Sequence, residues 1–232
     1  LVGSEMCIRD RLSYLRFCGR SGRKALSDDR RYTIVREPHK ENEMDLAAEK
    51  KALRRELKQK RKNLLESYRH QADRQILERA KSLELYRQAH RIFCYVSMAE
   101  EVDTRLLLEE MLAEGKIVAV PLCREKGVME AGQITSMDQL KPGAYGILEP
   151  KEDTEKLDSD SLDLCVIPCV ACSSSGVRLG YGGGYYDRFL PETRAKRIIL
   201  CQEQMLCENI PAEPHDCPMD LIVTEERVRE PV

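Results

Sequence analysis

Residues 45–68 carry the longest regular pattern of apolar and polar positions in the chain. Leucines recur close to one stripe at helical spacing, basic residues fill much of the rest, and most of the segment consists of strong helix formers. The pattern predicts a long amphipathic first helix. A second helix is expected over residues 72–85.

Short apolar runs alternate with helical segments over the rest of the chain. The runs at 91–96, 116–121, 162–168, 197–201 and 221–224 predict buried strands, and 127–134 predicts an additional one. Helices are expected from Asp103 or Thr104 to Glu114, with Gly115 ending that helix, and over 185–190. This alternation predicts a single α/β domain, a mostly parallel, doubly wound sheet flanked by helices, with a long N-terminal helix.

Residues 1–43 show no sustained apolar period and carry a patchwork of basic side chains. Such a segment buries little surface, and residues 2–11 look like translated sequencing-adapter read-through. We therefore expect residues 1–43 to be a disordered or artefactual extension, Met44 to be the start, and 44–232 to be the folded domain. The alternative is a basic arm that contacts RNA or a partner.

The composition argues against a nucleic-acid-binding, membrane or secreted protein. Lys and Arg total 38 against 40 Asp and Glu, so no overall field favours nucleic acid or a membrane as a partner. No apolar stretch approaches the roughly 20 residues of a membrane span, and the start lacks the pattern of a secretory signal. The ten cysteines are irregularly spaced and many lie in apolar runs, which indicates buried reduced thiols. We expect a cytoplasmic monomer.

The clearest chemical signal follows the strand predicted at 162–168. Four glycines lie within positions 180–184, and they remove the side chains that would keep a phosphate away from backbone N–H groups. Arg178 adds a permanent charge, Asp187 a hard oxygen ligand for Mg²⁺, and the expected helix start at 185 a favourable dipole. The segment has neither the Gly-Lys-Ser/Thr ending of a P-loop nor the short turn of a dinucleotide fingerprint. A plain turn or flexible hairpin is the alternative.

A more specific match exists for this segment. The run Arg178-Leu179-Gly180-Tyr181-Gly182-Gly183-Gly184-Tyr185-Tyr186-Asp187-Arg188-Phe189-Leu190 resembles the signature of the 5-formyltetrahydrofolate cyclo-ligase family. Three further segments agree with the family in order and spacing: Lys50-Lys51-Ala52-Leu53-Arg54, Val96-Ser97-Met98-Ala99-Glu100-Glu101-Val102-Asp103-Thr104, and Pro211-Ala212-Glu213-Pro214-His215-Asp216. The resemblance covers roughly residues 44–228.

The resemblance implies a set of binding residues. Contacts to ATP fall on Lys50, Arg54, Arg178, Leu179, Gly180, Tyr181, Gly182, Gly183, Gly184, Tyr185 and Tyr186. Contacts to the folate fall on Val96, Glu101, Tyr181, Gly182, Gly183, Gly184 and Tyr185. The implied cofactor, Mg²⁺, falls on Asp187 and Asp216. The alternative is a solvated face for the basic residues of the first helix, and a helix cap or surface charge for the two aspartates.

The implied reaction is the ATP-dependent closure of 5-formyltetrahydrofolate to 5,10-methenyltetrahydrofolate, with release of ADP and phosphate through an N5-iminium phosphate. One alternative is a non-catalytic nucleotide- or folate-binding protein of the same fold. A nucleic-acid-binding module that uses the basic first helix is another, but that helix lacks the interleaved aromatic residues that stack on bases, and only 5% of the chain is aromatic.

The chain departs from the family just before the glycine loop. Family members usually carry a glycine after the strand-end proline and a Phe-Asp pair further on, whereas this chain has Pro168-Cys169-Val170-Ala171-Cys172-Ser173-Ser174-Ser175. The missing pair puts the geometry of this lead-in segment in question. Cys169 and Cys172 also form a Cys-x-x-Cys, for which zinc or redox chemistry is an alternative to burial.

Overall fold

The computed structural model describes residues 38–143, 147–213 and 216–231. The extension predicted at 1–43 therefore lies largely outside the described residues, as do Pro214 and His215. The helices are α1 (Pro38–Lys62), α2 (Glu66–Ser82), α3 (Glu84–Gln88), α4 (Arg105–Ala113) and α5 (Tyr185–Phe189). No helix in this part of the chain is both long enough and apolar enough to cross a membrane.

The first helix begins and ends earlier than the leucine stripe predicts. It starts at Pro38 rather than Asp45, and α1 and α2 are separate because Leu65 takes an extended conformation, with φ −58° and ψ 134°. That conformation interrupts the helical hydrogen bonds, while Leu64 packs against the core. The break lets α1 and α2 cover opposite faces of the sheet.

An eight-stranded sheet forms the centre of the fold, in the order β13-β12-β10-β7-β1-β2-β3-β6. Its strands are β1 (Arg91–Cys94), β2 (Ile117–Cys123), β3 (Met129–Ile134), β6 (Lys156–Leu157), β7 (Leu164–Ile167), β10 (Lys196–Leu200), β12 (Leu221–Val223) and β13 (Val228–Arg229). The five strands from β12 to β2 run parallel, and β13, β3 and β6 are antiparallel to their neighbours. The mostly parallel, doubly wound sheet is thus confirmed.

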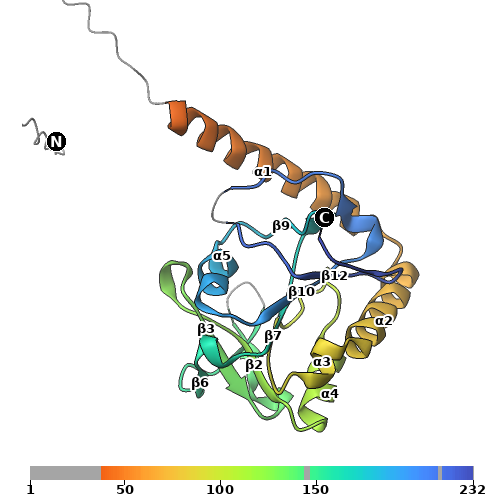
Figure 1. The fold of residues 1–232 in the computed structure, drawn as a ribbon, viewed down its shortest axis with the longest axis vertical. Coiled ribbons are helices and arrows are strands. Elements are labelled where there is room, and N and C mark those ends of the chain that lie inside the picture. Colours follow the sequence, from red (N-terminus) through yellow and green to blue (C-terminus); the bar gives the residue numbers. More distant parts are fainter. Residues whose placement is uncertain (1–37, 144–146, 214–215, 232) are drawn as a thin grey trace, which may run out of the picture. The chain divides into compact units, whose positions relative to one another are not determined.

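Alternate residues of the parallel strands enter two separate apolar clusters. Phe93, Ile167 and Ile199 belong to the cluster that includes Leu57 of α1 and Phe189 of α5. Ile92 and Cys94 belong to the other, together with residues of α2, α3 and α4. Because both faces are covered, the strands read as continuous apolar runs. Figure 1 shows α2, α3 and α4 grouped together, away from α1 and α5.

The strand order reverses between β1 and β7. From β1 the chain crosses through α4 to β2 on one side, and β7 lies on the other side, followed by β10 and β12. Ligands of open α/β sheets bind in the crevice beyond the carboxyl ends of the strands at such a switch point. The segments that follow β1 and β7 are therefore where a binding site is expected.

Two small sheets were not predicted from the sequence. β8 (Ala171–Ser173), β9 (Arg178–Leu179) and β11 (Leu206–Cys207) form one, in the order β11-β8-β9, and β4 (Leu140–Pro142) pairs with β5 (Leu148–Pro150) in the other. Strands β8 and β9 lie directly before the glycine loop in sequence and pair antiparallel, so the lead-in segment is a hairpin. β11 joins this hairpin from beyond β10.

Candidate active site

The N-terminal helix reaches the site with basic side chains spaced along one stripe. Lys50 donates to Glu213 and Asp216, with both N–O distances at 2.7 Å. One turn later, Arg54 Nε donates to the carbonyl of Gly180 at 2.8 Å. Two turns further on, the Arg61 guanidinium donates to the carbonyl of Val170 at 2.8 Å. α1 thus contacts the segment that follows β7, the glycine loop, and the two residues Glu213 and Asp216.

The glycine loop connects β9 to α5. Gly182 and Gly184 have φ values of 96° and 68°, which other residues rarely adopt. The Arg54 guanidinium lies where a side chain on Gly182 would make contact, at about 3.5 Å from the ideal Cβ position. A side chain there would fill the space beside this cation. The expected helix dipole is small, because α5 has only five residues.

Arg178 and Asp187 face one another across this loop. Arg178 Nη2 lies 2.6 Å from Asp187 Oδ1, and the two side chains are 6% and 29% exposed. The guanidinium also lies over the ring of Tyr186, 5.2 Å from its centroid. The loop therefore presents one cation and one carboxylate that are paired with each other.

Lys50 and Asp216 form a second cation–carboxylate pair. The Lys50 side chain is 7% exposed, and Asp216 also accepts a hydrogen bond from the backbone N–H of Glu213 at 2.7 Å. Burial acts to lower the pKa of Lys50, but the carboxylates of Asp216 and Glu213 outweigh it and the pKa ends above its usual value. Lys50 is therefore charged, and it is held beside two acidic groups.

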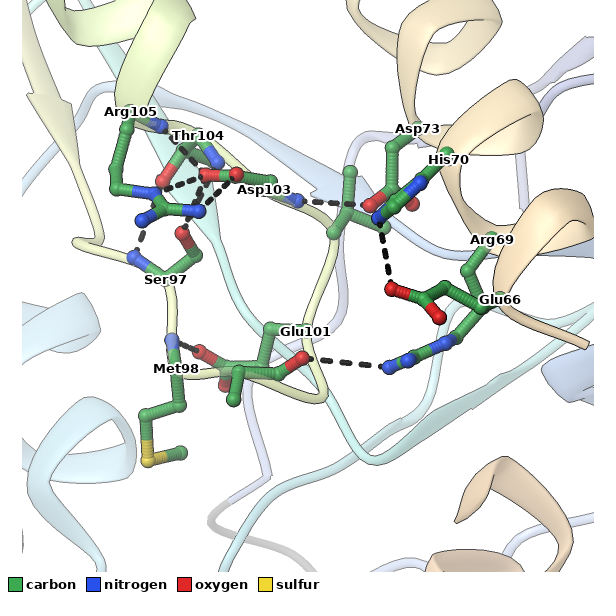
Figure 2. A network of polar contacts seen from close by, with 12 residues as sticks. Glu66, Arg69, His70, Asp73, Ser97, Met98, Glu101, Asp103, Thr104 and Arg105 are labelled. Carbon is green, nitrogen blue, oxygen red and sulfur yellow. Dashed lines mark hydrogen bonds and ion pairs between the residues drawn. The ribbon is translucent and has the colours of Figure 1, made fainter. Parts of the chain in front are cut away.

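The segment after β1 brings Glu101 into the switch point. Glu101 is 7% exposed, and its carboxylate accepts a hydrogen bond from the N–H of Met98 at 2.8 Å (Figure 2). Burial raises the pKa of Glu101, while the Met98 N–H, the Tyr181 hydroxyl and the Arg61 charge lower it without cancelling the rise. Val96 is 4% exposed and packs in the cluster formed with α2 and α4.

A polar network fixes this segment to its neighbours. Asp103 accepts from Ser97 Oγ at 3.0 Å and pairs with Arg105, and its own N–H donates to Asp73 of α2 at 3.2 Å (Figure 2). Gln202, at the carboxyl end of β10, donates to the same Asp73 at 2.9 Å. The contact with Arg105 holds the pKa of Asp103 down, to about 2. The loop that carries Glu101 is thus held by hydrogen bonds within the loop itself and to α2.

The unusual lead-in segment is an ordered hairpin. Ser173 Oγ accepts the N–H of Val177 at 3.1 Å and lies 2.8 Å from Ser175 Oγ, and Gly176 takes a φ of 76° at the turn. A serine hydroxyl is able to close such a turn in place of an aspartate. Cys169 and Cys172 are both buried free thiols. Within the described residues no three His, Cys, Asp or Glu side chains form a ready metal site.

The predicted site residues come from four regions of the chain. Lys50 and Arg54 come from α1, Val96 and Glu101 from the segment after β1, and the rest from the glycine loop and Asp216. Sequence reasoning missed two neighbours, Arg61 and Glu213. Arg61 lies seven residues after Arg54, a spacing that returns to the same helix face and was the available signal. Glu213 lay within a matched segment without an assigned role.

The chain is similar to known proteins of the family that its sequence motifs resemble. The sequence profile of the 5-formyltetrahydrofolate cyclo-ligase family matches residues 46–225. The 5-formyltetrahydrofolate cyclo-ligase of Haemophilus influenzae is 32% identical over 178 residues, covering 74% of this chain and 95% of that protein. The mouse enzyme of the same name is 28% identical over 190 residues, covering 76% and 94%.

Solved structures resemble the fold as well. The 5,10-methenyltetrahydrofolate synthetase of Aquifex aeolicus superposes with a TM-score of 0.70 at 31% identity, covering 78% of this chain and 92% of that one. The synthetase of Mycoplasma pneumoniae, with a TM-score of 0.62 at 22% identity, shares the fold. The profile match alone spans well over half of the sequence. The chain belongs to the 5-formyltetrahydrofolate cyclo-ligase family of ligases.

Proposed function

We propose that this enzyme uses ATP to close 5-formyltetrahydrofolate to 5,10-methenyltetrahydrofolate, releasing ADP and phosphate. The observation that carries the proposal is the presence of two cation–carboxylate pairs at one site, Lys50 with Asp216 and Arg178 with Asp187. The cations suit the oxygens of a triphosphate. The carboxylates suit Mg²⁺, which proteins commonly bind through one or two carboxylates together with substrate phosphates.

In this proposal, ATP contacts Lys50, Arg54 and the loop from Arg178 to Tyr186. Arg54 already donates to the loop at Gly180, so it supports the loop as well as the nucleotide. Asp187 and Asp216 would hold Mg²⁺, which supplies neutralisation of phosphate charge when bound. Both carboxylates are partly exposed, and each is paired with a cation. A bound triphosphate would pair with these cations in place of the carboxylates, which would then be available to Mg²⁺.

The folate is proposed to lie at the switch point, next to Glu101, Val96 and the loop from Tyr181 to Tyr185. The carboxylate of Glu101 is buried and retains acceptor capacity beyond its bond from Met98, so it suits the N–H donors of a pterin. Val96 is packed in the core, and it would contribute to the apolar wall behind the ring.

The proposed chemistry needs activation of the formyl group, because a formamide oxygen is a poor leaving group. The formyl oxygen attacks the γ-phosphorus, ADP leaves, and an N5-iminium phosphate results. N10 then attacks the formyl carbon and loses its proton. The C–O bond breaks, and phosphate leaves with the former formyl oxygen. The residues described here bind, align and neutralise charge, which is the main contribution of proteins to phosphoryl transfer.

The direct test is to mix the purified protein with 5-formyltetrahydrofolate and Mg-ATP and to follow the near-ultraviolet absorbance of the methenyl product. We expect a rise that depends on ATP and on Mg²⁺, with release of one phosphate per product. A folded protein that binds both ligands and gives a flat trace would instead favour the non-catalytic binding protein of the same fold.

We further propose that residues 44–232 contain the whole ATP- and folate-binding domain and that residues 1–43 are an extension. Deletion of 1–43 is expected to leave the rate of cyclisation and the melting temperature nearly unchanged, because the proposed contacts begin at Lys50. Steady-state rates and thermal unfolding of the two chain lengths provide the comparison. A large loss of either quantity would instead assign the extension a role in the fold or the site.

A further inference from the structure

Arg61 is a buried cation of α1 to which the proposed reaction assigns no role. It is 2% exposed, and its Nη2 donates to the carbonyl of Val170, just beyond the end of β7. Its Nη1 lies 3.5 Å from the hydroxyl of Tyr181 in the glycine loop. Its Nε is buried and has no acceptor among the described residues. The guanidinium therefore lies between the strand end and the loop.

The position of this cation coincides with the topological switch point. Val170 follows β7, and Glu101 follows the neighbouring strand β1. The Tyr181 hydroxyl interacts with both Arg61 and the Glu101 carboxyl, so the three side chains form a connected group. This group brings α1, the glycine loop and the segment after β1 together around the carboxylate that is proposed to bind the pterin.

The surroundings of Glu101 make the charge of Arg61 important. Burial favours the protonated form of this carboxyl, which would accept hydrogen bonds poorly, and the Arg61 charge favours the ionised form. Five ionisable side chains of the described residues interact electrostatically with Glu101: Arg61 of α1, Tyr181 of the loop, Tyr95 after β1, Cys169 after β7 and Tyr186 of α5. Arg61 is the cation among them.

A purely structural role does not account for the contacts of Arg61. The helix is already attached through Arg54 to Gly180 and through Leu57 to the core. A buried guanidinium whose Nε lacks an acceptor is costly for stability, and a neutral donor would satisfy the Val170 carbonyl as well. What a neutral donor would not supply is positive charge next to Tyr181 and Glu101.

We propose that Arg61 is a positioning residue of the folate site, which holds Tyr181 and the strand end at Val170 in place and maintains Glu101 as a carboxylate acceptor for the pterin. The inference rests on the proposed function and extends it to a residue outside the nucleotide contacts. It predicts that Arg61 affects the binding of the folate and leaves the binding of ATP largely unchanged.

The test compares Arg61→Gln and Arg61→Lys with Lys60→Gln, an exposed cation of the same helix turn. Gln keeps a donor for Val170 but removes the charge, and Lys keeps the charge but removes the planar fork. We expect Arg61→Gln to raise the KM for 5-formyltetrahydrofolate by about tenfold or more, with the KM for ATP changed by less than about twofold. Lys60→Gln should match the wild type.

The pH dependence of kcat/KM for the folate distinguishes a positioning role of Arg61 from a role in stabilising the fold alone. The Arg61 charge lowers the pKa of Glu101, so its removal raises that pKa, and the acidic limb of kcat/KM for the folate is expected to move to higher pH in Arg61→Gln. Arg61→Lys should return the limb toward the wild-type position. Calorimetric titration of the folate without ATP, at several pH values, is expected to show the same displacement in affinity.

Outcomes that contradict the inference are distinct from those that contradict the proposed function. An active wild type with an Arg61→Gln variant that keeps its folate KM and its acidic limb overturns the role of Arg61 alone. If Arg61→Gln does not fold, the Arg61→Lys variant decides. A raised KM for the folate together with a wild-type acidic limb of kcat/KM supports the positioning role of Arg61, and an unchanged KM for the folate opposes it. A wild type that neither binds nor cyclises the folate overturns both proposals.

Discussion

Asp187→Asn is expected to lower kcat by about 10²–10³-fold, which corresponds to roughly 3–4 kcal/mol of lost transition-state stabilisation. The carboxylate is proposed to hold Mg²⁺, and an amide is a much poorer ligand for that ion. Asn still offers an oxygen to Arg178, which lies 2.6 Å from the Asp187 carboxylate, so the loop should keep its conformation. The melting temperature is expected to change little, because the side chain is 29% exposed. Initial rates across a range of Mg²⁺ concentrations provide the measurement.

Asp220→Asn is the matched control for this variant. Asp220 pairs with Lys196 at 3.0 Å and accepts the N–H of Arg197 at 2.9 Å. It therefore lies at the amino end of β10, opposite to the proposed site. We expect normal turnover from Asp220→Asn. Normal turnover from Asp187→Asn as well would argue against a metal role for Asp187, and would leave it as the partner of Arg178.

The elements that could be predicted from the sequence are those whose pattern is set by burial alone. β1, β7 and β10 are covered on both faces, so consecutive residues are apolar over 92–94, 164–167 and 198–200. Gly115, with a φ of 74°, ends its helix as expected. In these cases local preference and tertiary packing favour the same structure, which is why the sequence was sufficient.

The elements that were missed depend on contacts between distant segments. The break between α1 and α2 falls where the leucine stripe continues through Leu64, so the periodicity gives no sign of it. The strands β8 and β9 contain cysteine, serine and arginine, which have no strong β-pattern, and their pairing comes from the turn closed by Ser173. β6 and β13 are two residues long and exist through their pairing with β3 and β12.

The candidate site shows the same division. The glycines of the loop could be recognised from the sequence, because the absence of a side chain is a property of the residue type itself. Arg61 was not distinguished among eight basic residues between positions 50 and 62, because burial of one of them depends on where Val170 and Tyr181 lie in the fold. The sequence gives the number of basic residues, but the fold determines which of their side chains are buried.

Lys50→Met is the second change for which a large effect is expected. We expect kcat/KM for ATP to fall by about 100-fold or more, because a buried cation proposed to bind the triphosphate is lost. Met has a similar length, so the side chain should still fill the space near α1. Lys50→Arg should recover part of the activity because it keeps the charge. Lys51→Met, which removes an exposed cation from the same helix turn, is the control and should behave as the wild type.

Thermal unfolding adds a readout for Lys50→Met that does not depend on turnover. In the wild type, Lys50 lies 2.7 Å from both Glu213 and Asp216, so its loss leaves two nearby carboxylates without this ammonium group. Their repulsion should lower the melting temperature, and MgCl₂ without ATP should raise it more in Lys50→Met than in the wild type, because a divalent cation replaces the missing charge. A folded Lys50→Met variant with wild-type kcat/KM for ATP would restrict Lys50 to anchoring the 213–216 segment, and an equal response of both proteins to MgCl₂ would remove Asp216 from the proposed metal site.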